Sequence, residues 1–218
     1  MRRGLVSEVF ATESALSRFG AMLTSVPVHV VTDRAAKALS DTVTPVGLVA
    51  VCSVPHVGLA DVIADHPQLV AIAVQISEPG NAGTLIRIAD AMGADAVVLA
   101  GHSVDPYNGK CLRASAGSIF SIPVVAEPEA AQVVTAFSAA GLQVLATTVD
   151  GEVSLDEADL SGPTAWLFGP EAQGLPTELA ETATHRVHIP MPGSAESLNV
   201  ASAASICLYQ SARSRRIV

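Results

Sequence analysis

Cysteine is scarce in this chain, and its placement excludes two classes of protein. Only three cysteines occur among 218 residues, Cys52, Cys111 and Cys207, and no CxxC pair is present. This spacing rules out a disulfide-stapled scaffold and a zinc site built from thiolates. Free thiols this far apart suit a reducing compartment, so we expect a cytoplasmic protein.

Long apolar runs are also missing. No stretch approaches the roughly 18 consecutive apolar residues of a membrane-spanning helix, although 50% of the chain is hydrophobic. The opening MRRGLVSEVF carries two arginines without the apolar core of a secretion signal. We therefore expect a globular protein with no membrane partner, long enough for one good core and a smaller companion domain.

Positive charge is in short supply, and the net charge of -9 argues against indiscriminate binding of polyanions. The excess of acids is local. Seven of them fall between Glu127 and Asp159, a stretch without any lysine or arginine. The acidity thus belongs mainly to one part of the chain, which leaves room for a basic site elsewhere.

Several common chemical motifs are absent. The chain has no GxGxxG after a strand, no GxxxxGK[ST] and no GxSxG. The dinucleotide fingerprint, the P-loop and the nucleophile elbow are therefore missing. The six histidines are scattered, and His185 and His188 have no carboxylate or cysteine at ligand spacing, so we expect no metal site.

What the chain does have, from residue 69 onward, is an alternation of strands and helices. LVAIAVQIS (69–77) is a continuous apolar run, typical of a strand buried on both faces, and GTLIRIADAMG (83–93) has helical spacing. The pattern predicts a parallel α/β sheet with helices on its faces. Further strands are expected at 96–101, 122–126, 142–149, 164–169 and 185–191, and further helices at 108–118, 128–141 and 197–214.

The first part of the chain is predicted to form a second, small α/β domain. About 50 residues is little for an independent core, so this domain is expected to lean on the larger one. Within it we expect strands at 28–33 and 46–53 and a helix at 34–40. The predicted organisation is an amino-terminal domain over 1–53, a linker over 54–68 and the main domain over 69–218.

Two segments of the main domain are candidates for chemistry. In EPGNAGTLIRIADAMGA, Asn81 lies at a helix start, where it is either an ordinary cap or a functional side chain, and Arg87 lies among apolar residues. In LFGPEAQGLP, Gly169 and Gly174 follow an apolar strand. They form either a plain turn or a backbone that approaches a ligand at the carboxyl end of a sheet.

The third candidate is IPMPGSAESLNVASAAS, whose final helix is predicted to begin at Ser197. One interpretation is a packing helix of small residues with Ser194 as its cap. That interpretation does not explain Glu196, Ser197 and Asn199, which we expect to lie without a solvent face. A buried Asn199 would need a hydrogen-bonding partner.

Taken together and in order, these segments resemble the motifs of the SpoU (TrmH-like) family of RNA ribose methyltransferases, in the SPOUT superfamily. The resemblance covers residues 70–213, and DPYNGKCLRASAGSIFSIPV is similar to the segment between the first two motifs. SDTVTPVGLVAV resembles the end of the substrate-binding domain of members that act on ribosomal RNA, including thiostrepton-resistance enzymes. The resemblance implies a C-terminal deep trefoil knot that binds S-adenosylmethionine, and a homodimer.

The implied reaction transfers a methyl group from S-adenosylmethionine to a ribose 2′-hydroxyl of structured RNA, with ribosomal RNA favoured over transfer RNA. By resemblance, the catalytic positions are Asn81, Arg87, Glu171, Ser197 and Asn199. The implied cofactor-binding residues are Phe168, Gly169, Ile189, Met191, Ser197 and Leu198. The candidates for RNA phosphate contacts are Arg113, Arg213 and Arg215, the last two being alternatively a solvated helix end.

Several alternatives stay open. Arg87 either assists loss of the hydroxyl proton or clamps an RNA phosphate and the developing oxyanion. The protein is either the methyltransferase, an S-adenosylmethionine-binding protein that modifies no RNA, or a structural dimer module. Related substrate domains begin earlier, so we expect the amino-terminal domain to be truncated. Because aromatics are only 4%, we expect RNA recognition by shape and phosphate.

Overall fold

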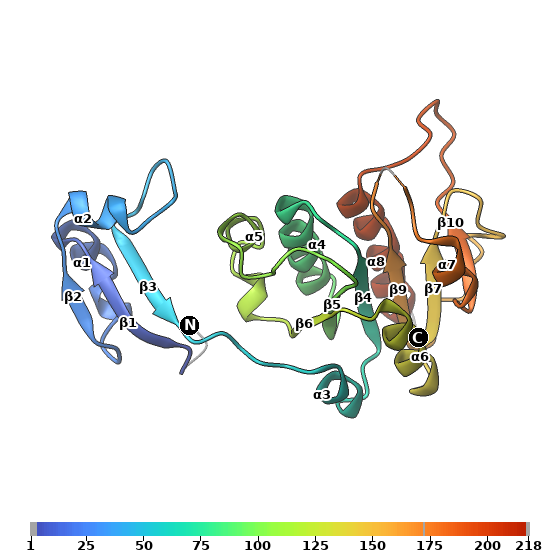
Figure 1. Ribbon diagram of the computed structural model, residues 1–218, viewed down its shortest axis with the longest axis horizontal. Helices are drawn as coiled ribbons and strands as arrows, with labels where there is room; N and C mark the ends of the chain where they lie inside the picture. Colours follow the sequence, from blue (N-terminus) through green and yellow to red (C-terminus); the bar gives the residue numbers. More distant parts are fainter. Residues whose placement is uncertain (1–3, 172, 217–218) are drawn as a thin grey trace. The chain divides into compact units, whose positions relative to one another are not determined.

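Two compact units make up the chain, and their boundary lies between Pro55 and His56. The computed structural model describes residues 4–171 and 173–216. Each unit has its own sheet and its own hydrophobic core, and the larger unit is carboxy-terminal (Figure 1). The segment 54–68 contains a short helix, α3 (Leu59–Ala64), whose Val62 packs into the core of the larger unit.

The amino-terminal unit is a three-stranded sheet with helices. Its strands lie in the order β2-β1-β3, with β2 parallel and β3 antiparallel to β1. Val9, Ala11, Ala15 and Leu23 form its buried core. The sequence reasoning predicted two of these strands and one helix, but it identified neither β1 nor α1. The elements are β1 (Val6–Ala11), α1 (Glu13–Phe19), a 3₁₀ turn (Gly20–Met22), β2 (Val28–Val30), α2 (Asp33–Ala38) and β3 (Leu48–Cys52).

The larger unit contains a seven-stranded sheet in the order β6-β5-β4-β9-β7-β10-β8, in which every pair of neighbours is parallel. The predicted parallel α/β sheet is confirmed. The strands are β4 (Leu69–Val74), β5 (Ala96–Ala100), β6 (Val124–Glu127), β7 (Gln143–Thr147), β8 (Val153–Ser154), β9 (Thr164–Phe168) and β10 (His185–His188). The helices that follow α3 are α4 (Pro79–Ala91), α5 (Gly109–Ala114), α6 (Ala130–Ala139), α7 (Thr177–Glu181) and α8 (Val200–Arg216), with a 3₁₀ turn at Ser118–Phe120.

Apolar residues on both faces explain why the central strands are covered on both sides. All six residues of β4 are buried, and alternate ones point to opposite faces. Ala71 and Ala73 belong to one core cluster with side chains of α4, α5 and α8, whereas Val70 and Ile72 belong to another with side chains of α3, α6 and α7. The sheet is therefore the middle layer of three.

The strand order brings distant parts of the chain to one edge of this sheet. After β6 the chain crosses to β7, and β9 later takes the place between β4 and β7. Because all strands are parallel, the loops after β7, β9 and β10 emerge at the same edge, together with the amino end of α4. In the part of the chain that the structure describes, no helix is both long and apolar enough to cross a membrane.

Candidate functional site

A cavity of about 510 Å³ opens at the carboxyl edge of the large sheet. Its walls come from the ends of β7, β9 and β10, from α7 and from the segment that leads into α8. This volume lies within the range of about 300–1,000 Å³ that is usual for small-molecule sites. All six residues predicted to bind a cofactor line it: Phe168, Gly169, Ile189, Met191, Ser197 and Leu198.

The loop after β9 forms one wall, and it requires glycine at its start. A Cβ on Gly169 would lie 2.4 Å from the Leu175 amide nitrogen and 2.6 Å from the Gly174 carbonyl carbon. The loop closes on itself because the Gly174 amide donates to the Pro170 carbonyl at 2.8 Å, and Gly174 has a φ of +68°. The need for glycine at position 169 thus comes from the close approach of the loop's own backbone, and both Gly169 and Gly174 line the cavity.

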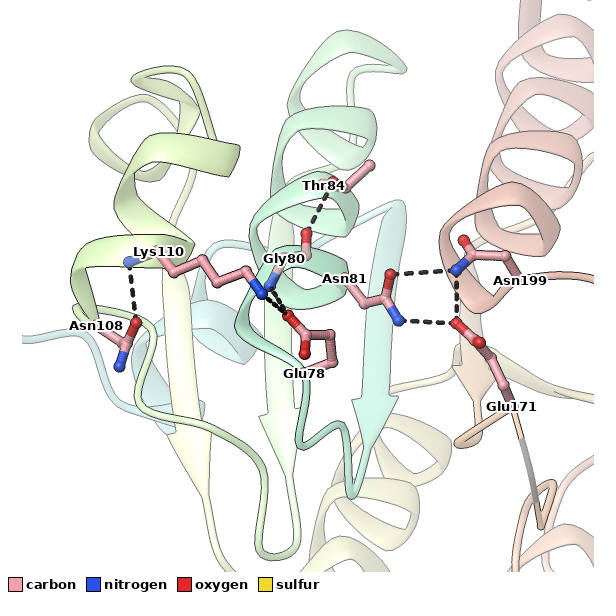
Figure 2. A network of polar contacts seen from close by, with 8 residues as sticks. All are labelled: Glu78, Gly80, Asn81, Thr84, Asn108, Lys110, Glu171 and Asn199. Carbon is pink, nitrogen blue, oxygen red and sulfur yellow. Dashed lines mark hydrogen bonds and ion pairs between the residues drawn. The ribbon is translucent and has the colours of Figure 1, made fainter. Parts of the chain in front are cut away.

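Next to the cavity, three polar side chains form one hydrogen-bonded network (Figure 2). Glu171 Oε1 accepts from Asn81 Nδ2 at 2.7 Å and from Asn199 Nδ2 at 2.6 Å. Asn199 Nδ2 also donates to Asn81 Oδ1 at 3.2 Å, and the Val200 amide donates to Glu171 Oε1 at 3.3 Å. Each of the three sequence motifs thus contributes one member of the network.

Asn199 has a second task, which corrects the expectation for the last helix. That helix begins at Val200 rather than at Ser197, and Asn199 Oδ1 caps it by accepting from the Ala201 amide at 3.0 Å and the Ser202 amide at 3.3 Å. Glu196, Ser197 and Asn199 precede the helix and are exposed, so the expectation that they lack a solvent face is wrong. One amide group serves the helix with its oxygen and the network with its nitrogen.

Asn81 does not cap its own helix. The cap of α4 is Glu78, whose Oε1 accepts from the Gly80 amide at 3.1 Å and pairs with Lys110 Nζ at 2.6 Å (Figure 2). The hydrogen bond from Lys110, followed by that from the Gly80 amide, lowers the pKa of Glu78. Because Glu78 supplies the cap, the Asn81 side chain in the first turn is left to bond with Glu171 and Asn199.

Arg87 lies apart from this network. It is exposed on α4, whereas its neighbours Leu85 and Ile86 are buried, which explains a charge within an apolar stretch of sequence. Arg87 follows Asn81 by six residues. At about 100° per residue, the two side chains therefore point in directions roughly 120° apart around the helix axis. Among the described residues, Arg87 has no hydrogen bond or ion pair to the network.

The three arginines proposed for RNA occupy different settings. Arg113 is exposed in the last turn of α5, and Arg213 is exposed on α8. Arg215 is partly buried and donates to the Gln68 carbonyl at the amino end of β4, the edge opposite the cavity. Burial lowers the pKa of Arg215, and the nearby Asp95 carboxylate opposes that shift.

Sequence reasoning missed the wall of the cavity formed by β7, α7 and β10. Among the described residues, Thr148 Oγ1 is the one buried side-chain polar atom without a hydrogen-bond partner, and Thr148 lines the cavity. For all but Glu181, which ends α7, the available signal was a position just after or within a predicted strand. The missed polar residues of the wall include Thr147, Thr148, Asp150, Glu181 and Arg186.

These features fit S-adenosylmethionine, a nucleoside with an amino-acid tail. The cavity has the volume for it, Gly169 and Gly174 of the loop after β9 line it, and the Thr148 hydroxyl lacks a partner of its own. No group of three or more His, Cys, Asp or Glu side chains in the described ranges is arranged to hold a metal ion.

Known proteins resemble this chain over most of its length. The model of the SpoU rRNA Methylase family matches residues 68–209. The chain is 35% identical to the 23S rRNA (guanosine(2553)-2′-O)-methyltransferase RlmP of Bacillus subtilis, over 94% of this chain and 80% of that protein. It is 38% identical to the 23S rRNA (uridine(2479)-2′-O)-methyltransferase of Streptomyces viridochromogenes, over 78% of this chain and 61% of the other.

A solved structure aligns with nearly the whole chain. The SpoU methyltransferase AviRb from Streptomyces viridochromogenes, in complex with the cofactor AdoMet, superposes with a TM-score of 0.85 and 32% identity. The alignment covers 99% of this chain and 85% of that one. The chain belongs to the SpoU rRNA methylase family.

Proposed function

We propose that this protein transfers a methyl group from S-adenosylmethionine to a ribose 2′-hydroxyl of structured RNA, with ribosomal RNA as the first candidate substrate. The observation that carries the proposal is the Asn81–Glu171–Asn199 network beside a cavity lined by all six expected cofactor residues. Relatives named as 23S rRNA 2′-O-methyltransferases and a neighbour in complex with AdoMet support the same reaction.

In this proposal the cavity residues hold the cofactor mainly through the backbone. Gly169, Ile189 and Leu198 offer amide and carbonyl groups, while Phe168 and Met191 supply apolar surface, with Ser197 at the edge. When bound, S-adenosylmethionine supplies a methyl group that its sulfonium sulfur has already activated. The main task of the protein is therefore to position the ribose hydroxyl.

Glu171 acts as the organiser of the polar side chains. Its Oε1 already accepts from Asn81, Asn199 and the Val200 amide, so this oxygen is not available to take a proton from a substrate. The carboxylate instead fixes the orientation of the two amide side chains. Asn81, whose Nδ2 donates one of its two hydrogens to Glu171, then presents its amide group to a ribose hydroxyl at the mouth of the cavity, together with Ser197, while Asn199 orients Asn81.

Arg87 serves as a clamp rather than as a base. A guanidinium remains protonated in proteins, which disfavours proton abstraction. It binds phosphate well and stabilises negative charge as it develops on the 2′ oxygen. Arg87 is exposed, so RNA has access to it.

The same proposal includes a trefoil knot and a homodimer. The strand order supports the knot, because β9 is inserted between β4 and β7, and the loops after β9 and β10 converge on one cavity. Two exposed apolar side chains on α8, Ile206 and Tyr209, support the dimer. Their exposure is more easily explained if a second copy covers them.

The test is transfer of labelled methyl from S-adenosylmethionine to unmodified ribosomal RNA and, separately, transfer RNA, followed by nuclease mapping. Label in a 2′-O-methyl nucleotide is expected, and the mapped position names the substrate. A protein that binds the cofactor without modifying RNA is the second candidate, favoured by the net charge of -9. Cofactor binding without label in either RNA would replace the first proposal with the second.

A further inference from the structure

The charges that line the cavity are mostly of one sign. Four carboxylates contribute to its walls, against a single guanidinium, that of Arg186. No other lysine or arginine among the described residues lines it. The four acids come from the loop after β7, the loop after β9, the end of α7 and the segment before α8. They are Asp150, Glu171, Glu181 and Glu196.

The positive charge of Arg186 is already matched within the protein. Its Nε pairs with Glu152 Oε2 at 3.0 Å, and its Nη1 lies 3.4 Å from Asp150 Oδ2. The Arg186 amide also donates to Glu152 Oε1 at 2.9 Å and is the main reason that the pKa of Glu152 is lowered. Arg186 therefore has little charge left with which to offset the remaining acids.

Those remaining acids lack cationic partners. In the described part of the chain, none of Glu171, Glu181 and Glu196 has an ion pair with a lysine, arginine or histidine. The segment between Glu127 and Asp159, which supplies the β7 wall, contains no lysine or arginine at all. The cavity thus carries uncompensated negative charge on several sides.

We infer that this acid lining selects the cationic cofactor, S-adenosylmethionine, over its demethylated product, S-adenosylhomocysteine. The inference rests on the proposed function. Loss of the methyl group turns a positive sulfonium into a neutral thioether, and the amino-acid tail is unchanged. The two ligands therefore differ by one positive charge and one methyl group, and uncompensated carboxylates favour the more positive of them.

Glu171 is the acid of the lining through which this preference for the cationic cofactor acts at the reaction site. It lines the cavity and at the same time bonds with Asn81 and Asn199 (Figure 2), so under the proposed function its charge acts close to the reacting groups. Glu181 and Glu196 stand outside the network and are exposed. Solvent weakens their effect, so we expect a preference of about fivefold rather than thousands. A preference of this size favours exchange of product for fresh cofactor.

The test is calorimetric affinity of the full chain for three ligands: S-adenosylmethionine, S-adenosylhomocysteine and sinefungin. Sinefungin carries an amine where the cofactor has its sulfonium, so it reports charge without a reactive methyl. In the unaltered protein, both cationic ligands should bind about fivefold more tightly than S-adenosylhomocysteine. Raising the salt concentration should weaken the binding of both cationic ligands and leave the affinity for the neutral thioether almost unchanged.

The double variant Glu181→Gln, Glu196→Gln should reduce the preference to about twofold by weakening the cationic ligands. Glu178→Gln is the matched control, because Glu178 is an exposed acid of the same helix that does not line the cavity. Equal or tighter binding of S-adenosylhomocysteine by the unaltered protein, or a preference independent of salt, would overturn the inference while leaving the proposed function standing. If none of the three ligands bound, both would fail.

Discussion

At the amino edge of the large sheet, the Asp95 carboxylate accepts from the Gln68 amide at 2.6 Å and the Leu69 amide at 2.9 Å. At the opposite edge, the Glu171 carboxylate accepts mainly from the side chains of Asn81 and Asn199. Both acids join residues that are distant in sequence. The second acid lines the cavity described above, and its main partners are side chains rather than backbone amides.

The difference separates a structural role from a chemical one. Asp95 ties the start of β4 to the start of β5, and Arg215 closes the same corner by donating to Gln68. Hydrogen bonds to backbone amides hold the two strands in place. The carboxylate oxygen that accepts them is then not available to a ligand. Glu171, in contrast, lines the cavity and is bonded mainly to side chains. Substitutions at the carboxyl edge should therefore lower methyl transfer, whereas substitutions at the amino edge should lower stability.

The largest effect is expected at the carboxyl edge. Asn81→Ala and Arg87→Ala, made separately, should each lower methyl transfer by about a hundredfold or more, because each removes a group that positions or stabilises the reacting hydroxyl. Affinity for S-adenosylmethionine should stay within about threefold, since neither side chain lines the cavity.

Single-turnover transfer and calorimetry check this result. Gln132→Ala, an exposed change on α6, serves as the control and should retain full activity. If either variant kept the unaltered turnover, the assigned role of that residue would be wrong.

The next largest effect is expected in the loop after β9. Gly169→Ala would place a methyl group 2.4 Å from the Leu175 amide nitrogen, so the loop must shift. We expect affinity for S-adenosylmethionine to fall by about tenfold or more and the unfolding free energy to fall by about 1–3 kcal/mol. Gly162→Ala is a suitable control, because its Cβ would meet no atom within 4 Å. Unchanged affinity in the Gly169 variant would mean that this loop does not shape the site.

At the amino edge, the expected effect is on stability alone. Asp95→Ala removes the acceptor of two backbone amides and should lower the unfolding free energy by about 1 kcal/mol, a modest value because the carboxylate is exposed. Transfer by the folded fraction should not change. Denaturant titration tests this, with Asp65→Ala as the control. A large loss of turnover per folded molecule would mean that Asp95 also contributes to the reaction and that its role is not structural alone.

The smallest expected effects concern the arginines. Arg113→Gln and Arg213→Gln should each flatten the dependence of RNA affinity on salt by about one unit of slope, if each contacts one phosphate. Arg215→Gln should leave that slope unchanged and lower stability, since its guanidinium already bonds with the Gln68 carbonyl. Filter binding over a range of salt concentrations checks all three. A flattened slope in the Arg215 variant would show that this arginine reaches RNA.

The sequence predicted those features of the fold and the site that depend on local sequence patterns. The apolar runs of β4, β5 and β9 indicated doubly covered parallel strands, and the motif resemblance identified six residues that share one cavity. It did not predict that β9 separates β4 from β7, because strand order depends on packing between distant segments. For the same reason it missed Thr148, just after β7, and Arg186 in β10, which line the cavity but lie outside the three motifs.

Capping explains the errors at the starts of α4 and α8. Asn81 and Ser194 both suit a helix start, yet the caps are Glu78 and Asn199. Which of several neighbouring polar residues caps a helix depends on its tertiary partners. Glu78 forms an ion pair with Lys110, and Asn199 donates a hydrogen bond to Glu171. A local pattern contains neither contact.

The two tasks of Asn199 connect the site to the kinetics of helix opening. The Ala201 and Ser202 amides are protected by its Oδ1. They can exchange with solvent only when the first turn of α8 opens, and the same movement pulls the Asn199 amide nitrogen from Glu171. Hydrogen exchange at these two amides therefore measures how often the site comes apart, even in a sample with no substrate. Any ligand that tightens the network should slow both amides together.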